Sequence, residues 1–194
     1  MIKLRTSRLL TILLYLIFSY KNKPLCTITI KQLTIYCEQH IMLVKAKAKA
    51  LIGIGFCGAL KDNIQIGDVI LPTASARDED TTDHYASKKM PATPDFHIIL
   101  IMAKHAMNKN LKVHIGPIVT TSASLKEDSK FIIKWSKYKT LGVDCETSVL
   151  YLISYLYNIK AGVILTVSDN LLTKYPTLLA KNMKKKYKKH STTQ

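Results

Sequence analysis

Three carboxylates in the second half of the chain lie at the predicted ends of a helix or a strand, where carboxylates often bind substrates or transfer protons. Asp144 and Glu146 come just before a stretch whose apolar residues recur at helical spacing, and Asp169 follows a continuous apolar run, AGVILTV at 161–167. The apolar positions after the first two acids are Val149, Leu150, Leu152, Ile153 and Leu156. One carboxylate can hold substrate hydroxyl groups while another gives a proton to a leaving group. The three acids are therefore candidate site residues.

The elements around these acids are expected to bring them to one place. The spacing after Glu146 predicts an amphipathic helix, so the two early acids lie in a loop at a helix N-terminus. The run at 161–167 predicts a buried parallel strand, with Asp169 at its carboxyl end. Ligands of open α/β sheets bind outside the carboxyl ends of the strands, so a shared pocket is expected. The alternative is structural, with Glu146 favoured by the helix dipole and Asp169 capping the next segment.

A glycine-rich stretch, AKALIGIGFCGAL at 48–60, is a second candidate region. It predicts a strand that runs into Gly53, Gly55 and Gly58. Glycine lets the backbone approach a ligand closely, which makes Gly58 a candidate ligand-binding residue. A structural turn is the alternative for such a cluster.

Polar residues between the apolar segments supply three more candidates. Residues 73–96 are predicted to form a loop, in which Arg77 and His84 are candidate pocket-wall residues. A loop histidine is more often a solvated hydrogen-bonding residue. A strand is predicted at 113–121, and Ser122 is a candidate binding residue at its end.

Two further helices are predicted. Residues 24–44 carry apolar side chains at helical spacing, although many of them are β-branched. Residues 95–108 form the other helix, which Asp95 is expected to cap in a structural role.

The composition is that of a globular protein with an excess of basic residues. The chain has 194 residues, 47% hydrophobic and 22% charged, which suits one domain with one core. The net charge of +16 would favour an anionic partner, but much of the excess lies in a tail at 173–194 that is expected to be solvated. Cys26, Cys37, Cys57 and Cys145 lack metal-ligand spacing, which favours free thiols in a reducing cytosol and no metal. A cytoplasmic location, without specific nucleic-acid or membrane binding, is therefore expected.

The first 23 residues do not fit the rest of the chain. Basic residues precede ten apolar ones, LLTILLYLIF at 9–18, which imitates a secretory signal peptide. This run is too short to span a membrane, and no small-residue cleavage pattern follows it. A core strand, a signal peptide and a divergent or displaced start remain open. The expected division is an N-terminal segment 1–23, a domain 24–172 and a basic tail 173–194.

The segments with the candidate residues resemble the nucleoside phosphorylase family. GVDCETSVLY at 142–151 and TVSDN at 166–170 are similar to segments of purine nucleoside and uridine phosphorylases and the related nucleosidases. IQIGDVILP at 64–72 follows the glycine-rich stretch as in that family. The resemblance covers 24–172 and implies a three-layer α/β/α fold with a mixed central sheet. It also implies a homo-oligomer in which dimers combine into hexamers.

The chemistry of that family implies a role for each candidate. Splitting a ribosyl C1′–N bond passes through an oxocarbenium-like state, so a site needs a carboxylate on the sugar hydroxyls and a donor to the leaving base. Glu146 would hold the 2′- and 3′-hydroxyls, and Cys145 would lie along the sugar face. Asp144 would contact the base edge, and Asp169 would bind or protonate a purine at N7.

The sequence departs from the family pattern where phosphate and base are held. Gly53 and Phe56 stand where the family has an arginine and a threonine or serine, and neither replaces an arginine fork for phosphate. Leu125 stands at the place of an aromatic residue that stacks on the base. Residues 126–140 contain no glutamine or arginine to read uracil, whereas Asp169 belongs to the purine-type pattern.

The resemblance therefore implies transfer of a ribosyl group from a purine or pyrimidine nucleoside to phosphate, a co-substrate, without a cofactor. The alternatives are a hydrolytic nucleosidase of the same fold, an inactive relative, and a basic protein that binds polyanions.

Overall fold

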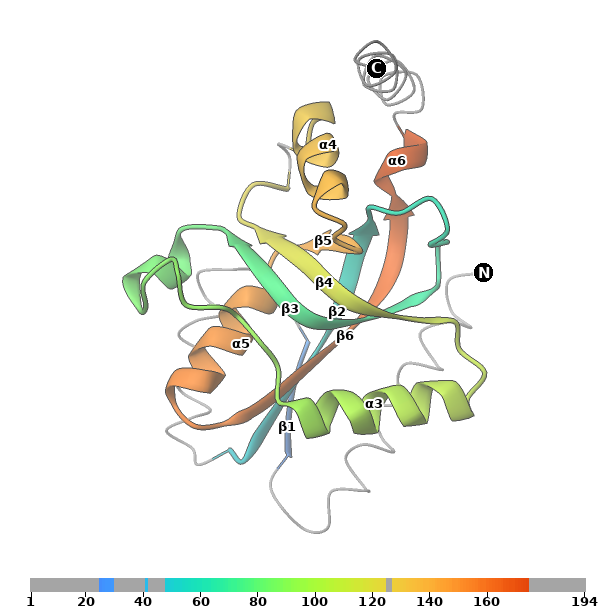
Figure 1. Ribbon diagram of the computed structural model, residues 1–194. Helices are drawn as coiled ribbons and strands as arrows, with labels where there is room; N and C mark the ends of the chain where they lie inside the picture. Colours follow the sequence, from blue (N-terminus) through green and yellow to red (C-terminus); the bar gives the residue numbers. More distant parts are fainter. Residues whose placement is uncertain (1–24, 30–40, 42–47, 125–126, 175–194) are drawn as a thin grey trace, which may run out of the picture.

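Two long parallel strands lie side by side in the computed structural model, which describes residues 25–29, 41, 48–124 and 127–174 (Figure 1). β2 (Ala50–Ala59) and β6 (Lys160–Asn170) pair from Ala50 with Lys160 to Ala59 with Asn170. Both are rich in apolar residues, several of them β-branched, which suits strands covered on both faces. The carboxyl ends of β2 and β6 therefore lie next to each other.

The remaining strands make the sheet mixed. β1 (Leu25–Thr29) is parallel to β2, and β4 (Val113–Thr121) is parallel to both β3 (Val69–Asp78) and β5 (Gly142–Asp144). The pairs β2–β5 and β3–β6 are antiparallel. Because β2 pairs with both β5 and β6, the sheet closes on itself, and segments distant in the sequence meet at its ends.

Helices cover opposite faces of this sheet, α3 (Phe96–Asn108) on one and α5 (Thr147–Leu156) on the other (Figure 1). Alternate strand residues face the two helices, as the twofold period of a strand requires. Leu51, Val163 and Leu165 belong to the core that includes α5, whereas Ala50, Ile52 and Ile164 belong to the core that includes α3. The expected α/β/α layering with a mixed sheet is confirmed.

A close contact fixes α3 against the sheet. A Cβ atom at Gly162 would lie 2.4 Å from Cγ2 of Ile98, so only glycine fits at this point of β6 without a shift of the helix. Gly162 therefore sets how near α3 lies to β6.

The helix that follows Asp144 and Glu146 is buried along most of its length. Residues 147–154 of α5 are all buried, and the Tyr151 hydroxyl donates to the Pro72 carbonyl oxygen at 2.8 Å. Burial of one large apolar side chain contributes about 1.5–3 kcal/mol, so α5 holds its N-terminus firmly.

Shorter helices lie near the carboxyl ends of β2 and β6. α4 (Ser129–Lys137) and α6 (Leu171–Lys174) lie at the same end of the sheet, and the 3-10 helix η1 (Thr81–His84) follows β3 (Figure 1). α4 begins at Asp128, whose side chain accepts from the backbone of Lys130 at 3.0 Å and of Phe131 at 2.9 Å. A small core of Leu60, Val119, Ile132, Trp135, Val143 and Leu171 joins α4 and α6 to the sheet.

Most predicted elements are present. The strand at 113–121 is β4, and the helix at 95–108 is α3, whose cap Asp95 accepts from the Ile98 backbone at 3.0 Å. The strand at 161–167 is the middle of β6, and the predicted amphipathic helix is α5.

Three predictions were wrong in part. Residues 25–29 of the predicted helix at 24–44 form β1, because β-branched residues there pair with β2. The predicted loop at 73–96 begins later, since β3 continues to Asp78 beside β4. The predicted loop before α5 contains β5, which hydrogen-bonded neighbours on both sides hold extended. In each case pairing with another strand overrides the local pattern.

The predictions for residues 1–23 and for the tail beyond residue 174 lie outside the described residues. Among the residues that the structure describes, no helix is long and apolar enough to cross a membrane.

Candidate active site

Asp144 ends β5 and shapes the turn into α5. Its Oδ1 accepts from the Thr120 hydroxyl at 2.7 Å, and its Oδ2 accepts from the Thr147 backbone N–H at 3.0 Å and from the Thr147 hydroxyl. Burial raises the pKa of Asp144, against the hydrogen bonds from Thr147 and Thr120 that lower it. Because both oxygens have protein partners, Asp144 acts as an anchor for the two residues that follow.

Glu146 stands at the N-cap position of α5 without making a side-chain cap. Burial, and next the charge of Asp144, raise the pKa of Glu146 to about 7. Its carboxyl group therefore keeps its proton to a higher pH than that of an exposed glutamate. Burial, with the charges of Glu146, Asp144 and Glu127, raises the pKa of Cys145 to about 12, so this thiol keeps its proton and does not act as a thiolate.

Strand pairing brings Asp169 to the same place. Gly58 of β2 pairs with Val143 on one side and with Asp169 on the other. The register shifts after Cys57, so Ser168 is an extra residue in β6, and its hydroxyl lies 3.2 Å from the Cys57 carbonyl oxygen and 2.8 Å from Asp169 Oδ1. Such bulges re-aim side chains near sites.

Asn170 takes the capping role that was the structural alternative for Asp169. Its Oδ1 accepts from the backbone of Leu172 at 2.9 Å and of Thr173 at 3.3 Å.

The carboxylate of Asp169 lies close to the backbone of Gly58. A Cβ atom at Gly58 would lie 3.5 Å from Asp169 Oδ1.

These residues line one cavity of about 330 Å³, which we name the acidic pocket. Five of the eight predicted site residues contribute to it, and they come from three separate elements and the turn before α5. The lining residues are Ile54, Gly55, Phe56, Cys57, Gly58, Glu127, Val143, Asp144, Cys145, Glu146, Ser168 and Asp169. The structure thus brings Gly58, Asp144, Cys145, Glu146 and Asp169 together.

Cys57 contributes a buried thiol to this pocket. Its pKa is raised by burial first and then by the charges of Asp144 and Asp169. This thiol therefore keeps its proton and does not act as a thiolate.

Glu127 is the pocket residue that the sequence did not indicate. It lies just before Asp128, the cap of α4, and reaches the acidic pocket from a segment far from the other acids in the sequence. Its position before a helix cap is too common a pattern to have singled it out.

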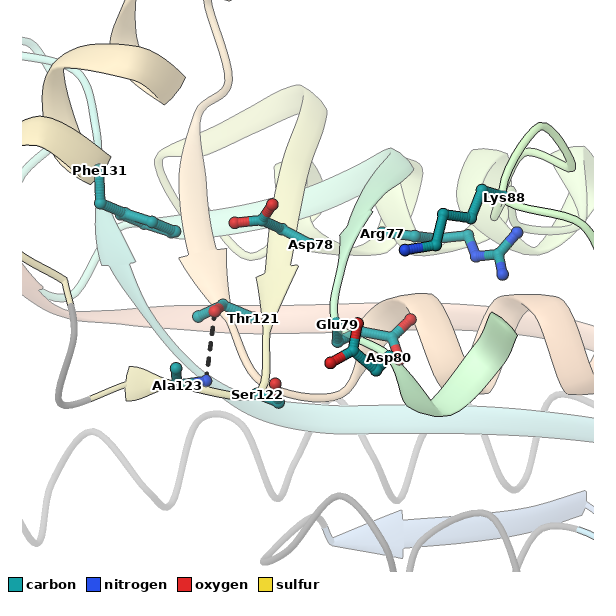
Figure 2. Close-up of a pocket in the computed structure, with 9 residues that line it drawn as sticks. All are labelled: Arg77, Asp78, Glu79, Asp80, Lys88, Thr121, Ser122, Ala123 and Phe131. Atoms are coloured by element: carbon teal, nitrogen blue, oxygen red, sulfur yellow. Dashed lines mark hydrogen bonds between the residues drawn. The ribbon is translucent and has the colours of Figure 1, made fainter. Parts of the chain in front are cut away.

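The other three predicted residues lie elsewhere. Arg77 and Ser122 line a second cavity of about 290 Å³, the loop pocket, with Asp78, Glu79, Asp80, Lys88, Thr121, Ala123 and Phe131 (Figure 2). His84 is exposed at the end of η1 and lines neither cavity.

Arg77 holds the chain segment that follows β3. Its guanidinium donates to Thr82 Oγ1 at 2.7 Å, to Asp83 Oδ1 at 2.9 Å, and to the carbonyl oxygens of Ser87, Met90 and Ala86 at 2.6, 2.9 and 3.1 Å. An arginine has five N–H donors, and all five have protein acceptors here. Arg77 therefore holds this segment in place from the wall of the loop pocket, and its contact with a ligand stays a prediction.

Buried hydrogen bonds link this segment to the acidic pocket. The Thr82 backbone and hydroxyl donate to Glu79, the Ser148 hydroxyl donates to Glu79 at 3.0 Å, and the Ser148 backbone donates to Thr120 Oγ1 at 3.0 Å. The Thr120 hydroxyl then donates to Asp144. The first turn of α5 thus lies between Arg77's segment and the acid turn.

The acidic pocket suits a neutral, hydroxyl-bearing ligand. Carboxylates accept hydrogen bonds from hydroxyls, and a protonated carboxyl can donate to a leaving group.

Among the described residues, no group of three or more histidine, cysteine, aspartate or glutamate side chains is placed to hold a metal ion.

The chain belongs to the phosphorylase superfamily, whose family model matches residues 30–191. Among its relatives, it is 28% identical to the guanosine phosphorylase of Halorubrum lacusprofundi over 67% of this chain and 54% of that one. It is 36% identical to a DeoD-type purine nucleoside phosphorylase of Bacillus velezensis over 63% of this chain and 53% of that one. The chain thus spans about half the length of these relatives.

Solved structures show the same architecture. The AMP nucleosidase of Bacteroides thetaiotaomicron superposes with a TM-score of 0.66 at 28% identity, over 71% of this chain and 58% of that one. A uridine phosphorylase of Vibrio fischeri superposes with a TM-score of 0.69 over 78% of this chain and 63% of that one. Its identity of 24% supports the fold alone.

Proposed function

We propose that this chain cleaves the ribosyl C1′–N bond of a purine or pyrimidine nucleoside in the acidic pocket. The observation that carries the proposal is that Glu146 and Asp169, from different elements, line one cavity beside the Gly58 backbone. The names of the similar proteins add support, since one is a guanosine phosphorylase and another an AMP nucleosidase.

Each acid has a distinct task in this proposal. Ionised Glu146 accepts hydrogen bonds from the ribose hydroxyls and stabilises the positive charge that develops on the sugar. Asp169 donates to the leaving base, and Asp144 holds the turn so that Glu146 points at the sugar. Cys145, with its thiol protonated, lies along the sugar face.

The acceptor that the resemblance implies is phosphate, and no cofactor is required. Phosphorolysis and hydrolysis break the same bond, so the cleavage step is common to both.

A homo-oligomer built from dimers belongs to the proposal as well. Light scattering of the purified chain measures the number of subunits.

The test is release of free base from inosine, guanosine, adenosine and uridine by the full chain. We expect release from at least one of them, and we expect Glu146→Gln to lower kcat/KM by about 10²-fold or more because the acceptor for the ribose hydroxyls loses its charge. Asp62→Asn, at an exposed turn outside both cavities, is the matched control and should leave the rate unchanged. Release that does not change in Glu146→Gln would remove the acidic pocket from the mechanism.

A further inference from the structure

Thr120 carries a fully buried hydroxyl group behind the turn at 144–146. It lies in β4 and pairs with Asp144 of β5, and its Oγ1 lies 2.7 Å from Asp144 Oδ1. The same oxygen lies 2.7 Å from Ser75 Oγ of β3 and 3.0 Å from the backbone nitrogen of Ser148 in α5. Three strands and the first turn of α5 therefore meet at this one hydroxyl group.

The direction of these hydrogen bonds follows from the number of protons. A hydroxyl group has one proton to donate and two lone pairs that accept. The Thr120 proton goes to Asp144, so the Ser75 hydroxyl is the donor to Thr120. The Ser148 backbone N–H takes the second lone pair. The hydroxyls of Ser75 and Thr120 thus form a chain that ends on the carboxylate, and hydrogen bonds in such a chain strengthen one another.

This chain makes Asp144 an acceptor on both of its oxygens. Oδ1 accepts from Thr120, and Oδ2 accepts from the backbone N–H and the hydroxyl of Thr147. An ionised carboxyl group accepts on both oxygens, whereas a protonated one would direct its own proton at a donor. Burial raises the pKa of Asp144, and the hydrogen bonds from Thr147, Thr120 and the Glu146 backbone lower it. The donors therefore oppose the cost of burying this charge.

The position of Glu146 depends on the turn that Asp144 holds, because Glu146 makes no side-chain cap to α5. On the basis of the proposed function, we infer that Thr120, supported by Ser75, is a positioning residue that holds Asp144 as a fixed anion and so directs Glu146 at the ribose hydroxyls. Thr120 lines neither cavity, so it acts through Asp144 and not by contact with a ligand.

The first test compares base release by the wild-type chain, Thr120→Val, Thr120→Ser and Thr140→Val. Valine keeps the shape of threonine without the hydroxyl group, whereas serine keeps the hydroxyl group. Thr140 is the matched control, because it is also buried and its hydroxyl donates to the Trp135 carbonyl oxygen at 2.9 Å, outside both cavities. We expect kcat/KM to fall by about tenfold to 10²-fold in Thr120→Val, and to stay within about twofold in the other two variants.

An equal loss of kcat/KM in Thr120→Val and Thr140→Val would overturn the inference, because any buried threonine would then have the same effect. A loss in Thr120→Ser as large as in Thr120→Val would also overturn it. If Thr120→Val does not fold, Ser75→Ala takes its place, since it leaves the bond from Thr120 to Asp144 intact. We then expect a loss of about three- to tenfold, and an unchanged rate would overturn the role of the chain.

The second test follows the titration of Glu146 by NMR and needs no turnover. The chain is labelled with 13C at the glutamate carboxyl groups, and Glu146→Gln identifies the signal. Burial, and next the charge of Asp144, raise the pKa of Glu146 to about 7. Without the Thr120 hydroxyl, Asp144 takes up a proton more readily and loses that charge, so the Glu146 titration should move to lower pH in Thr120→Val and not in Thr140→Val. The other ionisable groups that line the pocket are Cys57, Glu127, Cys145 and Asp169, and these variants change none of them.

The two tests separate this inference from the proposed function. A Glu146 titration that is the same in Thr120→Val and in the wild-type chain overturns the inference at any rate of base release. A titration that moves to lower pH, in a protein whose wild-type chain releases no base from inosine, guanosine, adenosine or uridine, overturns the proposed function and supports the control of Asp144 by Thr120.

Discussion

Asp144 and Glu146 are two residues apart, and their surroundings give them different tasks. Asp144 is buried, and hydrogen bonds from Thr120 and Thr147 engage both of its oxygens, so it fixes the turn. Glu146 makes no cap to its own helix and lines the pocket. The pattern of two acids before a helix therefore contains one structural and one functional candidate.

Asp169→Asn should lower kcat for base release by about 10²–10³-fold with little change in KM. The amide can still accept and donate hydrogen bonds, but it cannot deliver a proton to the departing base. Steady-state kinetics on the nucleoside that the wild-type chain cleaves fastest measure the effect. Asp62→Asn serves as the control.

A wild-type kcat in Asp169→Asn would show that the base leaves without help from this carboxyl group. A rise in KM alone would indicate that Asp169 binds the nucleoside without assisting the leaving group.

Glu146 should make the protein less stable as the pH rises. Its pKa is about 7 in the folded chain and 4.5 in the reference state, so between these values the folded state binds more protons and the free energy of unfolding falls with increasing pH. Glu146→Gln lacks this penalty. Its Tm relative to the wild-type chain should therefore increase between about pH 5 and about pH 8, as measured by thermal denaturation. A difference in Tm that is the same at every pH would contradict the raised pKa.

At the scale of elements, the segment after β3 depends on one buried side chain. The side chain of Arg77 is only 4% exposed, and it joins η1 to the carbonyl oxygens of residues 86, 87 and 90. The same segment is bonded through Glu79 and Ser148 to the start of α5. Loss of the guanidinium should loosen the segment first and the acid turn second.

Arg77→Ala should speed cleavage by trypsin after Lys88 and Lys89, because the five hydrogen bonds that hold this segment are lost. We also expect a loss of about 2–4 kcal/mol in the free energy of unfolding in urea, since a buried charged network is broken. Lys104→Ala, at an exposed position of α3, is the control for both measurements. An unchanged cleavage rate at Lys88 and Lys89 would show that Arg77 does not hold the segment.

Local sequence patterns predicted those helices and strands whose conformation is determined by their own residues. The helix after Asp95 and the strand at 113–121 follow from a cap and from a β-branched run, and both are present. β1 and β5 escaped prediction because each is held extended by neighbouring strands, and this information is not local. The same reason explains why β3 runs further than its polar residues suggest.

At the scale of the molecule, the candidate site exists because the sheet closes. Gly58 meets Val143 and Asp169 only because β2 pairs with β5 and β6 at once. The sequence indicated the acids through their position at element ends, but it could not indicate Glu127, which the fold brings in from the segment before α4. Arg77 and Ser122 looked equivalent to the other polar candidates in the sequence, and the fold places them in the loop pocket.

A crystal structure of Asp169→Asn with bound nucleoside tests the central claim most directly, because slowed cleavage should keep the substrate intact. We predict electron density for the nucleoside in the acidic pocket, with a ribose hydroxyl about 2.6–3.2 Å from the Glu146 carboxylate and the base beside position 169. A nucleoside bound in the loop pocket beside Ser122, or an acidic pocket that stays empty at saturating nucleoside, would contradict the account.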